Sequence, residues 1–179
     1  MRHHRFEHRL VRRRVLTPCW LAVALLLGCG SGTPAADTAP QSKVDREPIE
    51  GSAEAQCLDA ANRPRERVAH EPAVVGLRHI LIRHAESRRK DPKITRTRGL
   101  ACMRALDALH ALEGGADWDS TVAEYSDEKG AATRKGSLGT VRRDDLEPAF
   151  ADAAFGLEID QLSYVVESPA GFHIILRVE

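Results

Sequence analysis

The stretch RHILIRHAESRRK, residues 78–90, begins with an apolar run and ends in a cluster of positive charge. The apolar run closes a longer segment, residues 74–82, which is rich in β-branched and apolar side chains and is typical of a central strand. Arg88, Arg89 and Lys90 then follow in a polar loop. The stretch therefore predicts a buried strand that leads directly into a basic loop.

Two helices are predicted after this loop. Thr95 or Thr97 can cap the first helix, and a Gly-Gly pair at 114–115 ends it, because glycine tolerates the left-handed position after a helix. Its apolar side chains recur at helical spacing and are expected to face the core. They are Leu100, Met103, Leu106, Leu109 and Leu112. Asp117 caps a second, short helix over residues 118–125.

The rest of the chain predicts one strand, one helix and a hairpin of two strands. GSLGTV, residues 136–141, is a short strand, and DLEPAFADAAFGL, residues 145–157, is a helix with Pro148 in its first turn. LSYVVES, residues 162–168, and GFHIILRVE, residues 171–179, form strands joined by a tight turn. This order predicts an α+β domain with a four-stranded mixed or antiparallel sheet, surrounded by about three to four helices.

The first residues form a separate part of the chain. The 179-residue chain has a formal net charge of zero, which indicates no nucleic-acid partner, yet six of its first fourteen residues are arginines. The apolar run that follows is shorter than the roughly 20 residues of a membrane-spanning helix. It ends in Leu-Leu-Gly-Cys at Cys29, which resembles the lipobox of bacterial lipoproteins. An ordinary signal peptide, or a buried helix, is the alternative.

These features predict a signal peptide over residues 1–28 and a lipid anchor on Cys29. We expect a periplasm-facing lipoprotein, in the outer rather than the inner membrane, because Gly30 is not a retention signal of the aspartate type. Residues 29–72 are rich in Gly, Ser, Pro and Ala and predict a flexible tether, in which residues 53–62 can form a short helix. The folded domain is expected over residues 73–179.

The positions of the cysteines and histidines limit which kinds of site the chain can form. Cys57 and Cys102 can pair in an oxidising compartment, although two unpaired thiols are the favoured prediction, and no spacing indicates a metal or another cofactor. His79 and His173 lie on predicted strands between apolar neighbours, so each points to one face of the sheet. A lone histidine in this setting is usually a core residue, but nearby apolar side chains suggest a pocket. They are Leu138, Leu146, Phe150 and Phe155.

From about residue 77 to the C-terminus, the chain resembles the parvulin family of peptidyl-prolyl cis–trans isomerases. The matching stretches, in the family's order, are HILIRHAESRR, KITRT, SDEKGAATRKGSLG, LEPAFADAAFGL and GFHIILRVE. The resemblance is strongest to the branch directed at phosphoserine- or phosphothreonine-proline. It implies a parvulin-like fold of the FKBP-like superfold, with proline-containing polypeptides as partners, no cofactor and a monomeric state.

The resemblance also assigns roles to residues. His79 and His173 would be paired histidines beneath the site, with Glu128 or Asp127 as the catalytic acid. A substrate-binding pocket would be formed by Leu138, Leu146, Glu147, Phe150 and Ser168. An anion-binding loop would contain Arg83, Arg88 and Arg89. The chain departs from the family at Glu128, Glu147 and Ala170, where cysteine or aspartate, glutamine and serine are common.

Three functions compete at this point. The residue set favours a proline isomerase of extracytoplasmic proteins, with a preference for an acidic or phosphorylated residue before proline. The alternatives are a weakly catalytic parvulin domain that acts as an envelope chaperone or peptide-binding module, and a structural envelope lipoprotein. For the basic loop, the alternative is an ordinary solvated surface.

Overall fold

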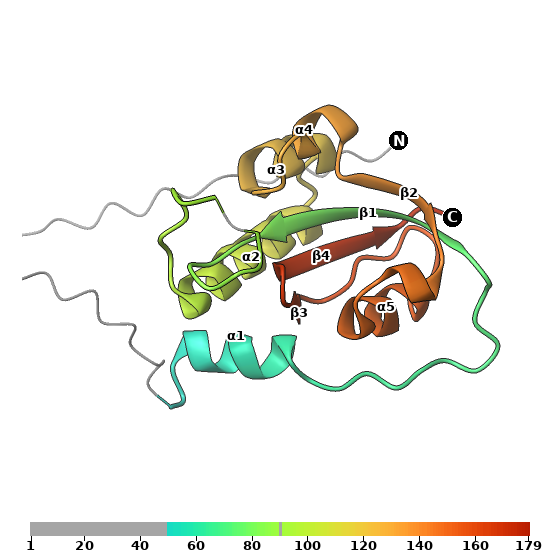
Figure 1. Ribbon diagram of the computed structural model, residues 1–179, viewed down its shortest axis with the longest axis horizontal. Coiled ribbons are helices and arrows are strands. Elements are labelled where there is room, and N and C mark those ends of the chain that lie inside the picture. The colour runs from blue at the N-terminus through green and yellow to red at the C-terminus, as the bar shows by residue number, and fades with distance from the viewer. Residues whose placement is uncertain (1–49, 90) are drawn as a thin grey trace, which may run out of the picture. The chain divides into compact units, whose positions relative to one another are not determined.

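The computed structural model describes residues 50–89 and 91–179 (Figure 1). The predicted signal peptide and Cys29 lie outside the described residues. In the described part, four antiparallel strands form one sheet in the order β2-β1-β4-β3. They are β1 (Val75–Ile82), β2 (Ser137–Val141), β3 (Val166–Ser168) and β4 (Gly171–Arg177). Of the two predicted sheet types, the antiparallel one is observed.

Helices cover both faces of this sheet. They are α1 (Ala53–Ala61), α2 (Arg98–Glu113), α3 (Trp118–Tyr125), α4 (Ala131–Arg134) and α5 (Pro148–Phe155), with a 3-10 turn η1 (Arg143–Asp145) before α5. Side chains alternate along β1, so Ile80 joins a core with α1 and α2, whereas Leu77 joins a core with α5. Among the residues that the structure describes, no helix has the length and hydropathy needed to span a membrane.

The short helix predicted over residues 53–62 is present as α1, but it packs into the core, whereas the prediction placed it in a flexible tether that reached residue 72. Ser52 caps α1 by accepting a hydrogen bond from the N–H of Ala55 (3.1 Å). Cys57, Leu58 and Ala61 recur at helical spacing and are buried against α2. This short apolar stripe lets α1 join the core, although the surrounding composition is typical of a linker.

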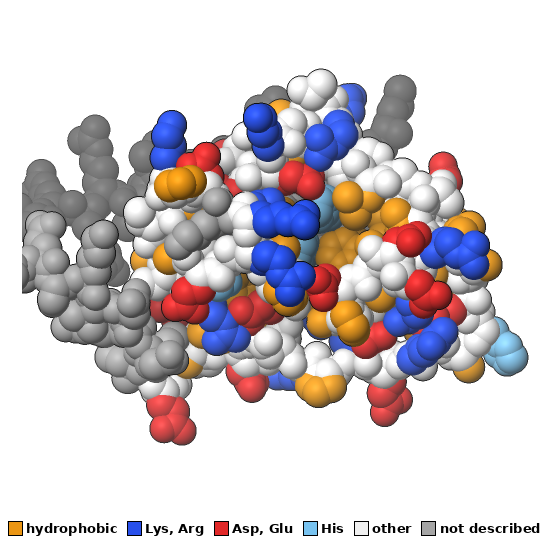
Figure 2. Space-filling view, viewed as in Figure 1, with side chains coloured by type: hydrophobic (Ala, Val, Ile, Leu, Met, Phe, Trp, Pro, Cys, Tyr) orange, Lys and Arg blue, Asp and Glu red, His pale blue; other side chains and the backbone are white. Residues whose placement is uncertain are grey.

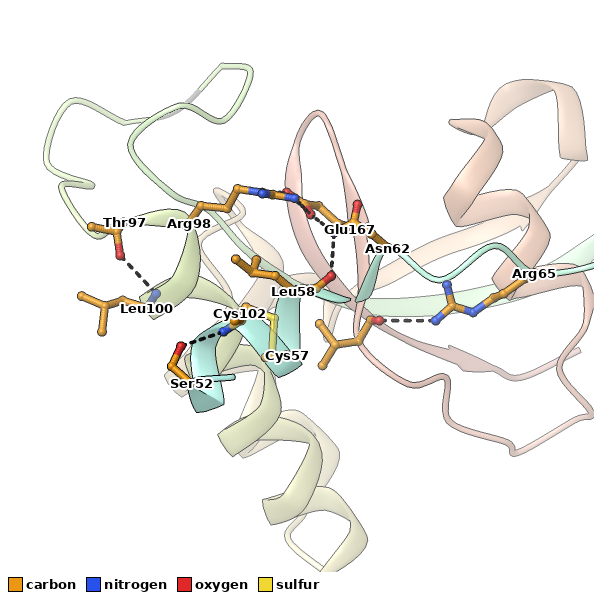
Figure 3. The surroundings of a disulfide bond; sticks show 12 residues. Ser52, Cys57, Leu58, Asn62, Arg65, Thr97, Arg98, Leu100, Cys102 and Glu167 are labelled. Atoms are coloured by element: carbon orange, nitrogen blue, oxygen red, sulfur yellow. Dashed lines mark hydrogen bonds and ion pairs between the residues drawn. A yellow bond between two sulfur atoms is a disulfide. The ribbon is translucent and has the colours of Figure 1, made fainter. Parts of the chain in front are cut away.

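A disulfide bond joins Cys57 of α1 to Cys102 of α2 (Figure 3). The favoured prediction of two unpaired thiols is therefore wrong. Both cysteines lie on the buried faces of packed helices, with 3% and 0% of their surfaces exposed, so the sulfur atoms meet. This pairing was only the less favoured alternative from the sequence, because the prediction did not bring α1 into the core.

The end of α1 also contacts the sheet. Asn62 donates a hydrogen bond to the carboxylate of Glu167 in β3 (2.5 Å), and Arg98 pairs with both oxygens of the same carboxylate (2.5 and 2.6 Å) (Figure 3). Arg65 donates to the carbonyl of Val165 (3.4 Å). The three-residue strand β3 is thus held by α1 and α2 as well as by β4.

Helix α2 begins as predicted but buries a different face. Thr97 caps it by accepting from the N–H of Leu100 (3.2 Å). Leu100 itself is 52% exposed, and the other predicted core side chains except Leu109 are only partly buried. The fully buried face carries small residues, namely Gly99, Ala101, Cys102, Ala105 and Ala108. These residues allow close approach of α1, so tertiary packing overrides the leucine pattern.

A glycine brings β2 against β1 next to His79. Gly136 follows α4 and has a φ of 70°, a conformation that side chains rarely adopt. A Cβ atom at this position would lie 2.3 Å from the carbonyl oxygen of His79. The close approach allows the N–H of His79 to donate to the carbonyl of Gly136 (2.8 Å). The backbone that carries the histidine is therefore fixed on both sides, by β2 and by β4.

Candidate active site

His79 of β1 and His173 of β4 meet on the face of the sheet that α5 covers. The strand register pairs His79 with Ile175, two residues from His173, so the histidines are diagonal neighbours on one face. Their rings are stacked with centroids 5.5 Å apart, and their Nδ1 atoms lie 3.2 Å apart. Each is 5% exposed. The two predicted histidines thus share one buried hydrogen bond.

Glu128 contacts the outer end of this pair. Its Oε2 lies 3.2 Å from Nε2 of His79 and 2.8 Å from the guanidinium of Arg134 in α4. An ionised carboxylate only accepts hydrogen bonds, so His79 carries its proton on Nε2. With one proton on each ring, Nδ1 of His79 is then an acceptor, and His173 donates to it from its own Nδ1.

Ser168 completes the network at the other end. Its Oγ lies 2.7 Å from Nε2 of His173 and accepts a hydrogen bond from the N–H of Ala170 (3.1 Å). Because His173 has its proton on Nδ1, its Nε2 accepts from the hydroxyl of Ser168. The donors therefore run in one direction, from Ala170 through Ser168, His173 and His79 to Glu128. Every polar atom of the two imidazoles has a partner.

The electrostatics of the site keep the inner histidine uncharged. Burial holds the pKa of His173 well below its usual value of 6.5, and repulsion from His79, whenever that ring is protonated, and from Arg83 acts in the same direction. The hydrogen bond from His79 lowers the pKa of the Glu128 carboxyl, with support from Arg134, and this outweighs the opposing effect of burial. The ring of His79 therefore lies between the neutral imidazole of His173 and the ionised carboxylate of Glu128.

Asp127, the other candidate acid, lies at the end of β1 and has a structural position. Its carboxylate accepts from the N–H of Arg83 (2.8 Å) and from the guanidinium of Arg96, and its own N–H donates to the carbonyl of Leu81 (2.7 Å). These bonds fasten the end of β1 to the loop that carries Glu128. Of the two acids left open by the sequence, Glu128 is the one in contact with a histidine.

An apolar surface lies beside the histidines. Phe150 of α5 packs its ring edge-on against His173 and His79, with centroids 4.9 and 5.8 Å away, and is 4% exposed. Leu138 and Leu146 are partly buried and pack against the same core. Figure 2 shows an apolar hollow bordered by histidine and, along one side, by basic side chains. The predicted pocket residues are therefore brought together.

The loop after β1 supplies basic side chains to the candidate site. The N–H of Arg88 donates to the carbonyl of Pro169 (2.7 Å), which ties the loop to the β3–β4 turn, and its guanidinium pairs with Glu147 (3.1 Å). Arg88 and Arg89 are exposed, whereas Arg83 is partly buried and donates to the carbonyl of Arg89. Arg83 therefore supports the loop from within, and Arg88 and Arg89 present its charge.

Two site residues were missed by sequence reasoning. Arg134 pairs with Glu128, and Arg96 pairs with Asp127. Helix α4 has only four residues, so no periodicity marks it, and the approach of Arg134 to Glu128 depends on that turn. Over residues 50–89 and 91–179, no three His, Cys, Asp or Glu side chains are grouped so as to hold a metal ion.

A four-stranded antiparallel sheet with a buried histidine pair under an apolar hollow defines a parvulin-type domain. The family model of the PPIC-type PPIASE domain matches residues 79–179, more than half of the chain. The chain belongs to this rotamase family. The segment with α1 lies before the matched region.

Named relatives agree with this assignment. The peptidyl-prolyl cis-trans isomerase pin1 of Schizosaccharomyces pombe is 35% identical over 123 residues, 66% of this chain and 65% of that protein. Pin1 of Malus domestica is 38% identical over 55% of this chain and 88% of its own. The foldase PrsA of Halalkalibacterium halodurans is 43% identical over 40% of this chain but only 22% of its own. The chain thus spans just under two thirds of the first of these relatives.

Solved structures show the same fold. The isomerase ESS1 from Candida albicans aligns with a TM-score of 0.56 and 29% identity, covering 63% of this chain and 66% of that one. The PPIase domain of TbPar42 aligns with a TM-score of 0.53 and 31% identity, covering 59% of this chain and 99% of that one. The predicted α+β parvulin fold is confirmed.

Proposed function

We propose that this protein is a peptidyl-prolyl cis–trans isomerase that acts on X-Pro bonds in polypeptides. The observation that carries the proposal is the continuous hydrogen-bond network from Ser168 to Glu128, which lies directly beneath Phe150 and the apolar hollow. This arrangement offers an apolar seat for a proline ring next to buried, oriented polar groups. A purely structural domain has no need of both features in one place.

The chemistry fits a reaction in which no covalent bond breaks. Rotation about the X–Pro bond is opposed by amide resonance, with a barrier of about 18–20 kcal/mol. Phe150, Leu138 and Leu146 would hold the proline ring while the preceding carbonyl turns. Removal of water from the amide disfavours its charge-separated resonance form, and fixed dipoles can stabilise the twisted state more than either planar state.

The histidine pair would act by shape and orientation. His173 has a pKa well below its usual value, because it is buried, and stays neutral at physiological pH. Ser168 and Glu128 fix which ring nitrogen carries each proton. A site with a fixed proton arrangement does not reorganise as the substrate twists, which is the advantage of a preorganised environment.

We propose further that the substrates carry an acidic or phosphorylated residue before proline. Arg88 and Arg89 are exposed in the loop after β1, and Arg88 reaches Glu147 at the start of α5. A guanidinium pairs well with carboxylate or phosphate. A hydrogen bond to a charged group contributes about 1.5–3 kcal/mol, and each 1.4 kcal/mol is a factor of ten. Replacing both arginines with alanine is expected to lower kcat/KM on Glu-Pro or phosphoSer-Pro peptides about 10- to 100-fold relative to Ala-Pro.

We also propose an extracytoplasmic location, with a lipid anchor at Cys29. The basic and apolar N-terminus with its lipobox-like end supports it. The Cys57–Cys102 disulfide supports it independently, because structural disulfides persist mainly in oxidising compartments. In that compartment, Glu-Pro and Asp-Pro are expected to be more frequent targets than phosphorylated residues.

A protease-coupled isomerisation assay on Ala-Pro and Glu-Pro peptides tests the activity. Phe150→Leu and Phe155→Leu form a matched pair, since both phenylalanines are buried in α5 but only Phe150 contacts the histidines. Both variants lose similar packing, so differences in turnover report on the site. We expect Phe150→Leu to reduce kcat/KM and folded Phe155→Leu to retain it. No turnover by the wild type, or equal losses in both folded variants, would contradict the proposal.

A further inference from the structure

One ion pair connects two borders of the apolar hollow. Arg88 is tied through its backbone to Pro169, in the turn that also holds Ser168, and its guanidinium lies 3.1 Å from Oε1 of Glu147. Glu147 is the residue before α5, three positions from Phe150. The pair therefore joins the turn between β3 and β4 to the start of α5, beside the histidines.

The same guanidinium is needed by an acidic substrate. Arg88 and Arg89 present the positive charge of the loop, and Arg83 is occupied by the Arg89 carbonyl. The guanidinium of Arg88 pairs with the carboxylate of Glu147. Glu147 occupies one arm of this guanidinium, so a carboxylate or phosphate before the substrate's proline competes with Glu147 for that arm and for the charge of Arg88.

We propose that Glu147 is a specificity-determining residue, which competes with the substrate's acidic residue for Arg88 and thereby limits the preference for anionic substrates. The inference rests on the proposed isomerase function. It assigns to Glu147 a role opposite to simple substrate binding. Glu147 would lower the advantage of Glu-Pro over Ala-Pro peptides, because it keeps Arg88 partly neutralised.

The exposure of the pair sets the size of the effect. The side chains of Arg88 and Glu147 are 64% and 45% exposed, and exposed ion pairs are weak. Opening the pair is therefore easy, and competition should reduce the preference without abolishing it. We expect about a two- to fivefold effect, which corresponds to about 0.4–1 kcal/mol at 1.4 kcal/mol per factor of ten.

The test compares the ratio of kcat/KM on acidic and neutral peptides. Wild type and Glu147→Gln are assayed on Glu-Pro, phosphoSer-Pro and Ala-Pro, and the acidic-to-Ala-Pro ratio is expected to rise about two- to fivefold in the variant. Asp144→Asn is the matched control, since Asp144 is an exposed acid in the neighbouring turn η1 and its loss removes the same charge. Its ratio is expected to equal that of the wild type.

A double variant separates competition for Arg88 from general charge repulsion. In an Arg88→Gln background no guanidinium is left to release, so Glu147→Gln should no longer raise the ratio. A rise of the same size in that background, or in Asp144→Asn, would overturn the proposal, as would equal changes on acidic and neutral peptides. If the wild type turns over none of the peptides, the isomerase function fails. The ratio of peptide affinities, measured by fluorescence anisotropy, then decides the role of Glu147.

Discussion

The proton arrangement of the histidine pair is determined at its two ends. Glu128 can only accept a hydrogen bond from His79, and the Oγ of Ser168 already accepts from Ala170, so its own hydrogen is free for His173. Adding a proton to His173 would turn its acceptor nitrogen into a donor that faces this hydroxyl. The network would have to rearrange inside a buried site. The network therefore opposes protonation of His173 in the same direction as burial, which is the main cause of its low pKa.

This arrangement predicts a loss of stability in mild acid. The unfolded chain protonates His173 near its usual pKa of 6.5, whereas burial lowers the pKa in the folded state, so folding becomes less favourable as pH falls below 6.5. One such group can reduce the free energy of unfolding by up to about 1.4 kcal/mol per pH unit. Glu128, whose pKa is also lowered, adds a loss only at more acidic pH.

Urea unfolding of wild type and His173→Gln between pH 7.5 and 5 measures this effect. The wild type is expected to lose stability below pH 6.5, and the variant, which lacks the titrating group, to lose less. Because other groups titrate in the same range, the difference between the two proteins is the quantity of interest. Parallel curves for both proteins would show that His173 is not the group responsible.

A second prediction concerns Leu146 in the wall of the apolar hollow. Leu146 is partly buried at the edge of the apolar core, so Leu146→Ala should leave the fold intact, with an unchanged circular-dichroism spectrum. The loss of contact with the proline ring should lower kcat/KM on every X-Pro peptide, acidic or not. Ile159→Ala, at a position 59% exposed, is the control. Unchanged isomerisation by folded Leu146→Ala would remove this wall from the site.

The helices and strands that have a nearby sequence signal, such as a capping residue, were predictable from the sequence. Thr97 and Asp117 cap α2 and α3 as expected, and Pro148 begins α5. The alternation along β1 and β4 indicated that His79 and His173 each point to one face of the sheet, and the parvulin resemblance paired them, as the structure does. Each of these signals lies within a few residues of the feature that it predicts.

The elements that depend on distant contacts were not predictable in the same way. Helix α1 is stable because its short apolar stripe packs on the alanine face of α2, and neither stripe is strong alone. The disulfide follows from that packing and not from cysteine spacing. Likewise, the choice of Glu128 over Asp127 depends on where the loop after α3 crosses the end of β1.

Helix α1 leads to a prediction about redox conditions. The disulfide closes a loop of 45 residues, and a cross-link of this size stabilises a fold by about 3–4.5 kcal/mol in the chain-entropy model. A Cys57→Ala, Cys102→Ala protein should therefore unfold at lower urea concentration than the oxidised wild type, and so should the reduced wild type. Reductant should not shift the midpoint of the double variant further. No difference between oxidised wild type and the double variant would show that the disulfide adds little to stability.

At the scale of the whole molecule, the folded part and the proposed anchor are separated by a short stretch of chain. About 20 residues lie between Cys29 and the start of α1 at Ala53. In the proposed anchored form, a flexible tether of this length would have an r.m.s. span of about 25 Å. The hollow would then remain close to the membrane surface, where it would meet polypeptides as they emerge. Loss of the anchor would free the domain without altering its site.

Membrane attachment is therefore predicted to depend on Cys29 alone. Acyl chains contribute about 0.8 kcal/mol per buried CH₂ group, so a lipidated Cys29 should hold the protein in the membrane pellet. Cys29→Ser should move it to the soluble or precursor fraction, and isomerase activity per folded molecule should not change. Cys19→Ser is the matched control, because Cys19 lies within the predicted signal peptide and would be removed with it. A processed Cys29→Ser protein that still pellets with membranes would contradict the lipid anchor and leave the isomerase domain unaffected.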